Sequence, residues 1–240
     1  SSIPSYNFTV ATAQRRIGSN SNIRAILVNQ QEFKGDSGQV RLEGYNYNRV
    51  AGLDYNYNFL HNKWTGNIFY HKLFTPQESD GQYAHGYSLI YNTQKLNFNW
   101  YHQIIGKGFD PSVGFVPRKG YKRGSPSFVY YFYPDSKVLI SHGPAADLSF
   151  IWDDVYGYTD HELKYSYRFS FQNNGTLDFN AVNTYTFLFR DFDPSNSPAG
   201  PGIVKLPALS EYKYWYGVMN FSSDPRKLFN VTTTATYGNY

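Results

Sequence analysis

Hydrophobic and polar residues alternate along long stretches of this chain. From 163 to 171 every odd position is Leu, Tyr or Phe, and the even positions between them are Lys164, Ser166, Arg168 and Ser170. Successive side chains of a β-strand point to opposite faces, so alternation with a period of two predicts a strand with one apolar and one polar face. A second run spans 177–189, and the Asn174-Gly175 pair between the two runs favours a tight hairpin turn.

The same alternation recurs at 51–59, 83–91, 96–100 and 212–218, and in the last run the expected apolar face is Tyr212, Tyr214, Tyr216 and Val218. We expect about a dozen strands, many of them about 10–13 residues long. Globular strands usually have about 5–6 residues, whereas a tilted membrane-spanning strand needs about 9–11, so the lengths favour strands that cross a membrane. The runs at 8–16 and 23–32 alternate poorly, and Gly143-Pro144 predicts a bulge or a sheet edge.

The connections between these runs also follow a pattern. Short turns are expected at 18–21, 61–62, 93–95, 134–137, 173–176 and 222–227, and longer segments rich in Gly, Pro and Asp at 33–44, 75–80, 107–121 and 190–207. Alternation of tight turns with longer loops is typical of outer-membrane barrels. We therefore predict an all-β fold, an antiparallel up-and-down transmembrane β-barrel, as one domain over 1–240. Because strand-like sequence continues to Tyr240, we expect this domain to be part of a larger barrel.

Composition supports strands and excludes several other classes. Aromatic residues make up 20% of the chain, and they favour pleated, half-buried surfaces. The mean hydropathy of −0.55 and the absence of any apolar stretch of about 20 residues exclude a membrane-spanning helix, but a barrel shows lipid only every second side chain. With no Cys, disulfides and thiolate catalysis are excluded. The net charge of +4 comes without a Lys/Arg run, so we do not expect nucleic acid as a partner.

The sequence contains no recognisable catalytic or metal-binding constellation. The six His residues lack the spacing of a metal site, and the adjacent pair Asp153-Asp154 points to opposite faces of a strand. Ser141 and His142 are sequence neighbours, and they leave a barrel-embedded hydrolase open as an alternative. We expect neither an enzyme nor a cofactor.

Charged residues on the polar faces are the first candidate binding groups. Lys164 and Arg168 would lie in the lumen of a barrel and favour anionic solutes, aided by charges on neighbouring polar faces: Arg41, Arg190 and Lys213. In the alternative, Lys164 and Arg168 pair with acidic residues and fill a closed lumen, and the candidate partners are Glu162, Asp178 and Glu211. The abundant Tyr residues would form an aromatic girdle or a surface that stacks on sugars.

The glycine-rich segment 106–118 is the second candidate. It lacks the Gly-Lys-Ser/Thr ending of a phosphate-binding loop, so we expect a large loop that folds at the barrel mouth. Phe109 and Arg118 are its candidate binding residues.

Five segments, 7–10, 14–22, 106–118, 222–227 and 236–240, together resemble a known family. They look like the C-terminal barrel of large Bacteroidota outer-membrane proteins that carry an N-terminal domain like carbohydrate-binding-module family 9, a barrel of undefined function. The resemblance touches most of the chain, and its most specific piece is 109–118. It implies a Gram-negative outer membrane and a link to carbohydrate, but it supplies no catalytic residues. Family members usually continue beyond the Gly238-Asn-Tyr240 region, so the chain is expected to be the middle of a larger barrel.

The sequence thus leads to one functional hypothesis with two alternatives. We expect a protein of the cell outer membrane that acts as a channel, a transport component or a membrane anchor, linked to carbohydrate binding or uptake. Its expected partners are outer-membrane lipid, lipopolysaccharide and other outer-membrane or periplasmic proteins. The alternatives are a secreted carbohydrate-binding β-sandwich and the barrel-embedded hydrolase.

Overall fold

The computed structural model describes residues 5–33, 46–77, 79–194 and 205–239, and within them every regular element is a β-strand. The strands are β1 (Ser5–Ile17), β2 (Ser21–Phe33), β3 (Tyr47–Phe59), β4 (Trp64–Phe74), β5 (Tyr83–Asn92), β6 (Leu96–Ile105), β7 (Tyr121–Tyr130), β8 (Leu139–Asp153), β9 (Gly157–Phe171), β10 (Thr176–Leu188), β11 (Ser210–Ser222) and β12 (Thr232–Gly238). The all-β prediction is confirmed. The described residues contain no helix with the length and hydropathy needed to cross a membrane.

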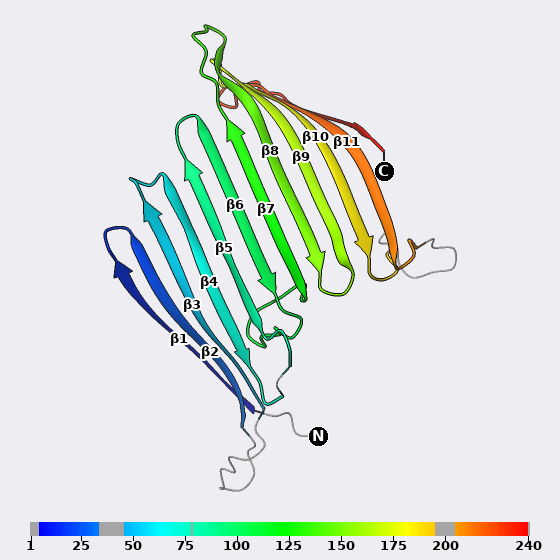
Figure 1. Cartoon of the computed structure of the whole chain (residues 1–240). Helices are drawn as coiled ribbons and strands as arrows, with labels where there is room; N and C mark the ends of the chain where they lie inside the picture. The colour runs from blue at the N-terminus through cyan, green and yellow to red at the C-terminus, as the bar shows by residue number, and fades with distance from the viewer. Residues whose placement is uncertain (1–4, 34–45, 78, 195–204, 240) are drawn as a thin grey trace. The chain divides into compact units, whose positions relative to one another are not determined.

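The strands follow one another in the order β1 to β12 in a single twelve-stranded sheet, with neighbours running antiparallel (Figure 1). This confirms the up-and-down topology. The edge strands β1 and β12 each pair with a single neighbour among the described residues. The chain divides into two compact units, the first comprising 1–92, 99–124 and 153–155 and the second the remaining residues.

In the first unit the register sorts the side chains onto two faces. Directly paired residues share a face, and the pairs Arg24–Asp54, Asn22–Asn56 and Gln30–Asn48 define the polar face. The opposite, apolar face is defined by pairs of large hydrophobic residues: Leu53–Tyr70, Tyr55–Ile68, Phe59–Trp64, Ile68–Tyr87 and Trp64–Tyr91. The alternation predicted over 51–59 and 83–91 is therefore confirmed.

The second unit has the same two-faced organisation. Its polar face is defined by the pairs Arg168–Asp178, Ser166–Asn180, Lys164–Val182, Val182–Tyr216 and Thr184–Tyr214. Its apolar face is defined by Tyr167–Phe179, Tyr165–Ala181, Phe179–Met219 and Leu177–Phe221. The predicted faces of 163–171 and 177–187 are confirmed.

The prediction for β11 was wrong in its faces. Tyr214 and Tyr216 pair with Thr184 and Val182 and so lie on the polar face, whereas Trp215, Met219 and Phe221 belong to the apolar face. Both sets of alternate positions in β11 contain aromatic residues, so the local pattern does not distinguish the faces. Only pairing with β10 assigns them.

Most connections agree with the predicted turns, with two exceptions. Between β8 and β9 the chain turns through 154–156, a short connection that is not among the predicted turns. Gly157 follows this turn, and its φ of +73° lies in the left-handed region, which glycine adopts more readily than other residues. Gly143 and Pro144 lie within β8 rather than interrupting it, and a Cβ at Gly143 would collide with the carbonyl oxygen of Tyr130, so the glycine permits close backbone approach.

Candidate functional site

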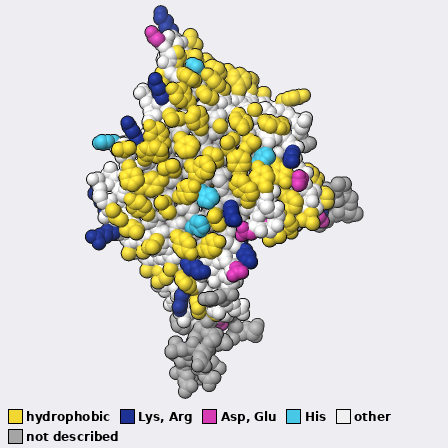
Figure 2. Space-filling view, viewed as in Figure 1, with side chains coloured by type: hydrophobic (Ala, Val, Ile, Leu, Met, Phe, Trp, Pro, Cys, Tyr) yellow, Lys and Arg dark blue, Asp and Glu magenta, His cyan; other side chains and the backbone are white. Residues whose placement is uncertain are grey.

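The apolar faces of both units are exposed. In the first unit Leu53 and Ile68 are 56% and 52% exposed, and in the second unit Trp215 is 53% exposed. Figure 2 shows one face of the molecule largely covered by hydrophobic side chains with few charged groups among them. Soluble monomers rarely expose contiguous apolar patches larger than about 300–600 Å². Such faces require an apolar environment or a covering partner.

Aromatic rings gather at strand ends on these apolar faces. Beside the β3–β4 turn, the ring centroids of Trp64 and Tyr91 lie 4.5 Å apart and those of Tyr57 and Phe59 5.4 Å apart. In the second unit Tyr156, Phe187 and Phe189 pack together next to the β8–β9 turn. Rings at the ends of spanning strands are the arrangement expected of an interfacial girdle.

On the polar face of the first unit, three charged or titratable side chains form a network across β2, β3 and β4. The Arg24 guanidinium donates to Asp54 Oδ2 from Nε at 2.8 Å and from Nη2 at 2.6 Å, and His71 Nε2 lies 2.9 Å from Asp54 Oδ1. The absence of a side chain at Gly52 makes room for the His71 ring, because a Cβ there would collide with it. Asp54 is only 4% exposed, and the Arg24 guanidinium balances its negative charge at a position where little water reaches it.

The loop 106–120, predicted to fold at a barrel mouth, lies over the end of this polar face. Phe109 is 5% exposed and belongs to a hydrophobic cluster with Val50, Leu73, Ala84 and Ile105. Arg118, the other candidate residue of this loop, has Nη2 3.6 Å from Asp153 Oδ2 and its guanidinium 5.7 Å from the centroid of the Tyr121 ring. Both residues therefore anchor the loop rather than offering free binding groups.

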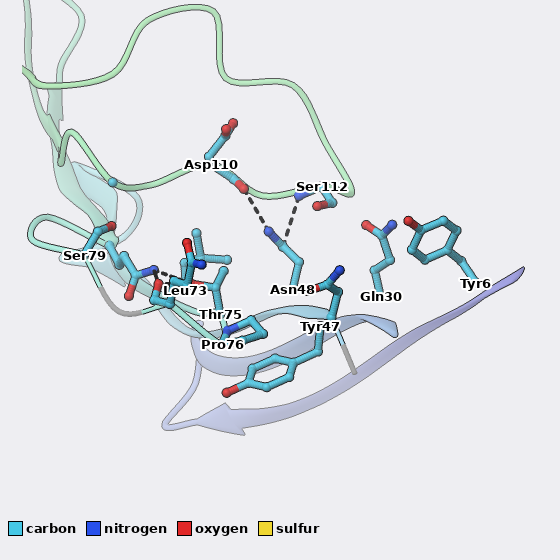
Figure 3. Close-up of a pocket in the computed structure, with 14 residues that line it drawn as sticks. Tyr6, Gln30, Tyr47, Asn48, Leu73, Thr75, Pro76, Ser79, Asp110 and Ser112 are labelled. Atoms are coloured by element: carbon cyan, nitrogen blue, oxygen red, sulfur yellow. Dashed lines mark hydrogen bonds between the residues drawn. The ribbon is translucent and has the colours of Figure 1, made fainter. Parts of the chain in front are cut away.

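One side chain ties the tip of this loop to the strands. Asn48 Nδ2 donates to the carbonyl oxygen of Asp110 at 2.9 Å, and Asn48 Oδ1 accepts from the backbone N–H of Ser112 at 3.0 Å (Figure 3). The loop thereby arches over β2 and β3 and leaves a hollow of about 640 Å³ beneath it. Gln30 and Tyr6 lie on the strand side of this hollow (Figure 3).

The second unit has a smaller pocket of about 140 Å³ on its own polar face, and charged residues contribute to its lining. Lys164 and Arg168, the predicted lumen charges, both line it, together with Asp147, Asp178 and Asn180. Arg168 forms a bidentate ion pair with Asp178, with Nε–Oδ1 and Nη2–Oδ2 distances of 2.5 Å and 3.2 Å. Lys164 makes no ion pair within the described part of the chain. One of the two candidate cations is thus neutralised, and the other is available.

The remaining charges predicted near this face are distributed differently. Lys213 and Glu211 lie on the apolar face, where Lys213 Nζ is 5.0 Å from the centroid of the Tyr185 ring and 3.9 Å from Glu211 Oε2. The expectation that they share a face with Lys164 was wrong, because the pairing of β11 with β10 places the odd-numbered residues of β11 on the apolar face. Arg190 is exposed beyond the end of β10, and Arg41 lies outside the described residues.

The structure separates Ser141 from His142. Both residues contribute to the lining of the pocket in the second unit, but His142 Nδ1 lies 2.7 Å from the hydroxyl of Tyr167 and its ring stacks on Phe169 of the apolar face. Consecutive strand residues point in opposite directions, so these two side chains form no hydrogen-bonded pair. In the described ranges no three His, Cys, Asp or Glu side chains come together as a metal site, and Asp153 and Asp154 interact with Arg118 and Lys122.

Some residues of these sites had no sequence signal. Asp54 was placed on a polar face by its alternation with Leu53 and Tyr55, but its partner Arg24 lies in a run that alternates poorly. Asn48 and Asp110 are 62 positions apart, and no local pattern links them.

No protein-family model, curated protein or solved structure matches this chain. A functional assignment therefore depends on the geometry of the two faces.

Proposed function

We propose that this chain forms part of the wall of a β-barrel in a bacterial outer membrane, where it acts as a channel, a transport component or a membrane anchor. The observation that supports the proposal is the opposite character of the two faces. Outside β1, each unit exposes large hydrophobic side chains on one face, while its opposite face carries ion pairs, amides and a hollow. Lipid against the first face and water against the second would satisfy both.

A soluble β-sandwich explains the same strands less well. A sandwich buries the apolar faces of its two sheets against each other, about 10 Å apart. Here residues that would form such a core are exposed, Leu53 and Trp215 by more than half, and within each unit no described segment covers these two side chains. The strands are also long, since β8 and β9 have 15 residues each, whereas globular strands usually have about 5–6.

Closure of the sheet is part of the proposal. An unpaired strand edge in lipid leaves backbone N–H and C=O groups without partners, at a cost of several kcal/mol per group, so membrane sheets close into barrels. The outer edges of β1 and β12 would then pair with each other, with further strands or with a partner protein of the outer membrane or periplasm. Lipid and lipopolysaccharide would contact the apolar face.

The resemblance to Bacteroidota barrels with a preceding carbohydrate-binding domain is compatible with this proposal. It favours a Gram-negative outer membrane and a role connected with carbohydrate. No step of the argument for a membrane sheet depends on it, because exposure and register lead to that proposal independently.

The proposal is tested by the solubility of the purified protein and by its behaviour in a bilayer. We expect it to require detergent, to retain its β-sheet circular dichroism on heating in detergent, and to insert into lipid vesicles. A monodisperse monomer in plain buffer would contradict a membrane barrel. Single-channel recording in a planar bilayer then separates the roles, because a channel carries current and an anchor does not.

A further inference from the structure

The hollow beneath the loop 106–120 has a lining with little charge. Amide and hydroxyl side chains predominate, among them Gln30, Gln82, Thr75 and Ser112. Among the described residues of the lining, Asp110 is the only one of the types Asp, Glu, Lys, Arg and His. Its carboxylate points away from the hollow in Figure 3 and lies 3.0 Å from Lys119 Nζ. A charged ligand would therefore leave water without gaining an opposite charge.

Several groups of the lining are already committed to holding the hollow open. Asn48 uses its amide on the backbone of Asp110 and Ser112, and Gln82 Nε2 donates to Thr75 Oγ1 at 2.7 Å. Because these bonds fix the loop and the β4–β5 connection, the hollow exists before a ligand arrives. Its volume of about 640 Å³ lies within the range of roughly 300–1,000 Å³ that is usual for small-molecule sites.

Gln30 and Tyr6 remain available for a ligand. The buried Gln30 Oε1 has no hydrogen-bond partner in the described structure, so the amide can turn toward a ligand without losing a bond. The Tyr6 side chain extends from β1 toward Gln30 in Figure 3, and Tyr6 is 43% exposed. An amide and a phenol each donate and accept hydrogen bonds, and the Tyr ring adds an apolar surface.

We infer that this hollow binds an uncharged, polyhydroxylated solute, a neutral saccharide in chemical class. Hydroxyl groups that both donate and accept match amides and phenols, while the C–H surface of a sugar ring suits an aromatic side chain. The inference deepens the proposed function and rests on it, because a solute reaches the hollow only where the polar face borders water.

The test is isothermal titration calorimetry on the whole chain in detergent with three kinds of hexasaccharide. The neutral probes are maltohexaose, cellohexaose and mannohexaose, the anionic probe is hexagalacturonate, and the cationic probe is the hexamer of glucosamine. We expect at least one neutral probe to bind, and both charged probes to bind at least about tenfold more weakly. The Gln30→Leu substitution should weaken the neutral probe by about fivefold to tenfold, since one hydrogen bond is lost.

The matched control is Gln14→Leu, because Gln14 lies on β1, on the same face of the first unit but outside the lining of the hollow. This variant should bind the neutral probe as tightly as the original chain. Equal affinity for neutral and charged probes, an unaffected Gln30→Leu variant, or no binding of any neutral probe by protein that inserts into vesicles would overturn the inference. Protein that is soluble without detergent would instead overturn the proposed membrane role, so the two failures are distinguishable.

Discussion

Leu53 and Asp54 are neighbours on β3, and Leu53 is 56% exposed whereas Asp54 is 4% exposed. In a water-soluble sheet the apolar neighbour is the buried one, because removal of apolar surface from water is the dominant favourable contribution to folding. Here the carboxylate is covered by Arg24 and His71, which interact with it, and the leucine is left outside. This inversion suits a sheet with lipid on one side, and it leads to specific expectations.

A charge on the apolar face should destabilise the membrane-inserted protein. We expect Leu53→Lys to lower the free energy of unfolding in lipid vesicles by about 2–4 kcal/mol, the cost of a cation near the bilayer midplane. The matched control is Thr12→Lys near the middle of β1, on the polar face, where Thr12 pairs with Ile26; it should cost less than about 1 kcal/mol. Urea unfolding followed by tryptophan fluorescence measures both, and equal losses would contradict a lipid-facing Leu53.

Removal of the charge on Asp54 should disrupt the network on the polar face of the first unit. We expect Asp54→Asn to reduce the free energy of unfolding by about 1–3 kcal/mol, because the amide carries no charge and offers Arg24 and His71 one acceptor oxygen instead of two. Arg24 is about half exposed and regains water, which keeps the loss below that of a fully buried ion pair. Asp135→Asn, an exposed position in the β7–β8 connection, serves as the control and should have no measurable effect.

Phe109 should hold the loop 106–120 against the strands. Truncation in Phe109→Ala removes the side chain from its cluster with Leu73 and Ile105, at a cost of about 3–5 kcal/mol, enough to release the loop locally. We expect trypsin to cleave at Lys107, Arg118 or Lys119 faster in this variant than in the original chain. Phe115 is 86% exposed in the same loop, so Phe115→Ala should leave the cleavage rate unchanged. Equal protection of both variants would mean that Phe109 does not anchor the loop.

If the protein conducts, replacement of Lys164 should change ion selectivity alone, whereas replacement of Arg168 should change both selectivity and stability. Lys164 makes no ion pair in the described structure, so Lys164→Gln removes one positive charge from the polar face and should shift the reversal potential toward cations. Arg168→Gln should shift it in the same direction and also reduce stability, because Asp178 loses its bidentate partner. Lys213→Gln alters the opposite face and should leave the reversal potential unchanged. A shift with Lys213→Gln equal to that with Lys164→Gln would contradict the assignment of faces.

Local alternation predicted the strands and most of their faces, because a period of two is a property of neighbouring residues. The run from Leu163 to Phe171 has hydrophobic residues on one parity only, and the structure confirms its faces. In β11 the aromatic residues Tyr214 and Trp215 occupy both parities, so the faces there, and with them the position of Lys213, depend on pairing with β10.

The sites were less predictable than the strands because they depend on contacts between distant residues. Lys164 and Arg168 were placed correctly on one face, but the sequence did not distinguish a free charge from a paired one, since Asp178 becomes a partner only through the hairpin register. The hollow depends on Asn48 reaching the backbone of Asp110, and neither residue carries a local signal of that contact.

The central claim, that one face of this sheet meets lipid and the other meets water, is tested most directly by spin labels on β10. The chain has no Cys, so Ala181→Cys on the apolar face and Thr184→Cys on the polar face each give a single labelling site. In lipid vesicles we expect electron paramagnetic resonance to find the label at 181 accessible to oxygen dissolved in lipid and the label at 184 accessible to a water-soluble nickel chelate. Equal access of the nickel chelate to both labels would contradict a membrane-spanning sheet.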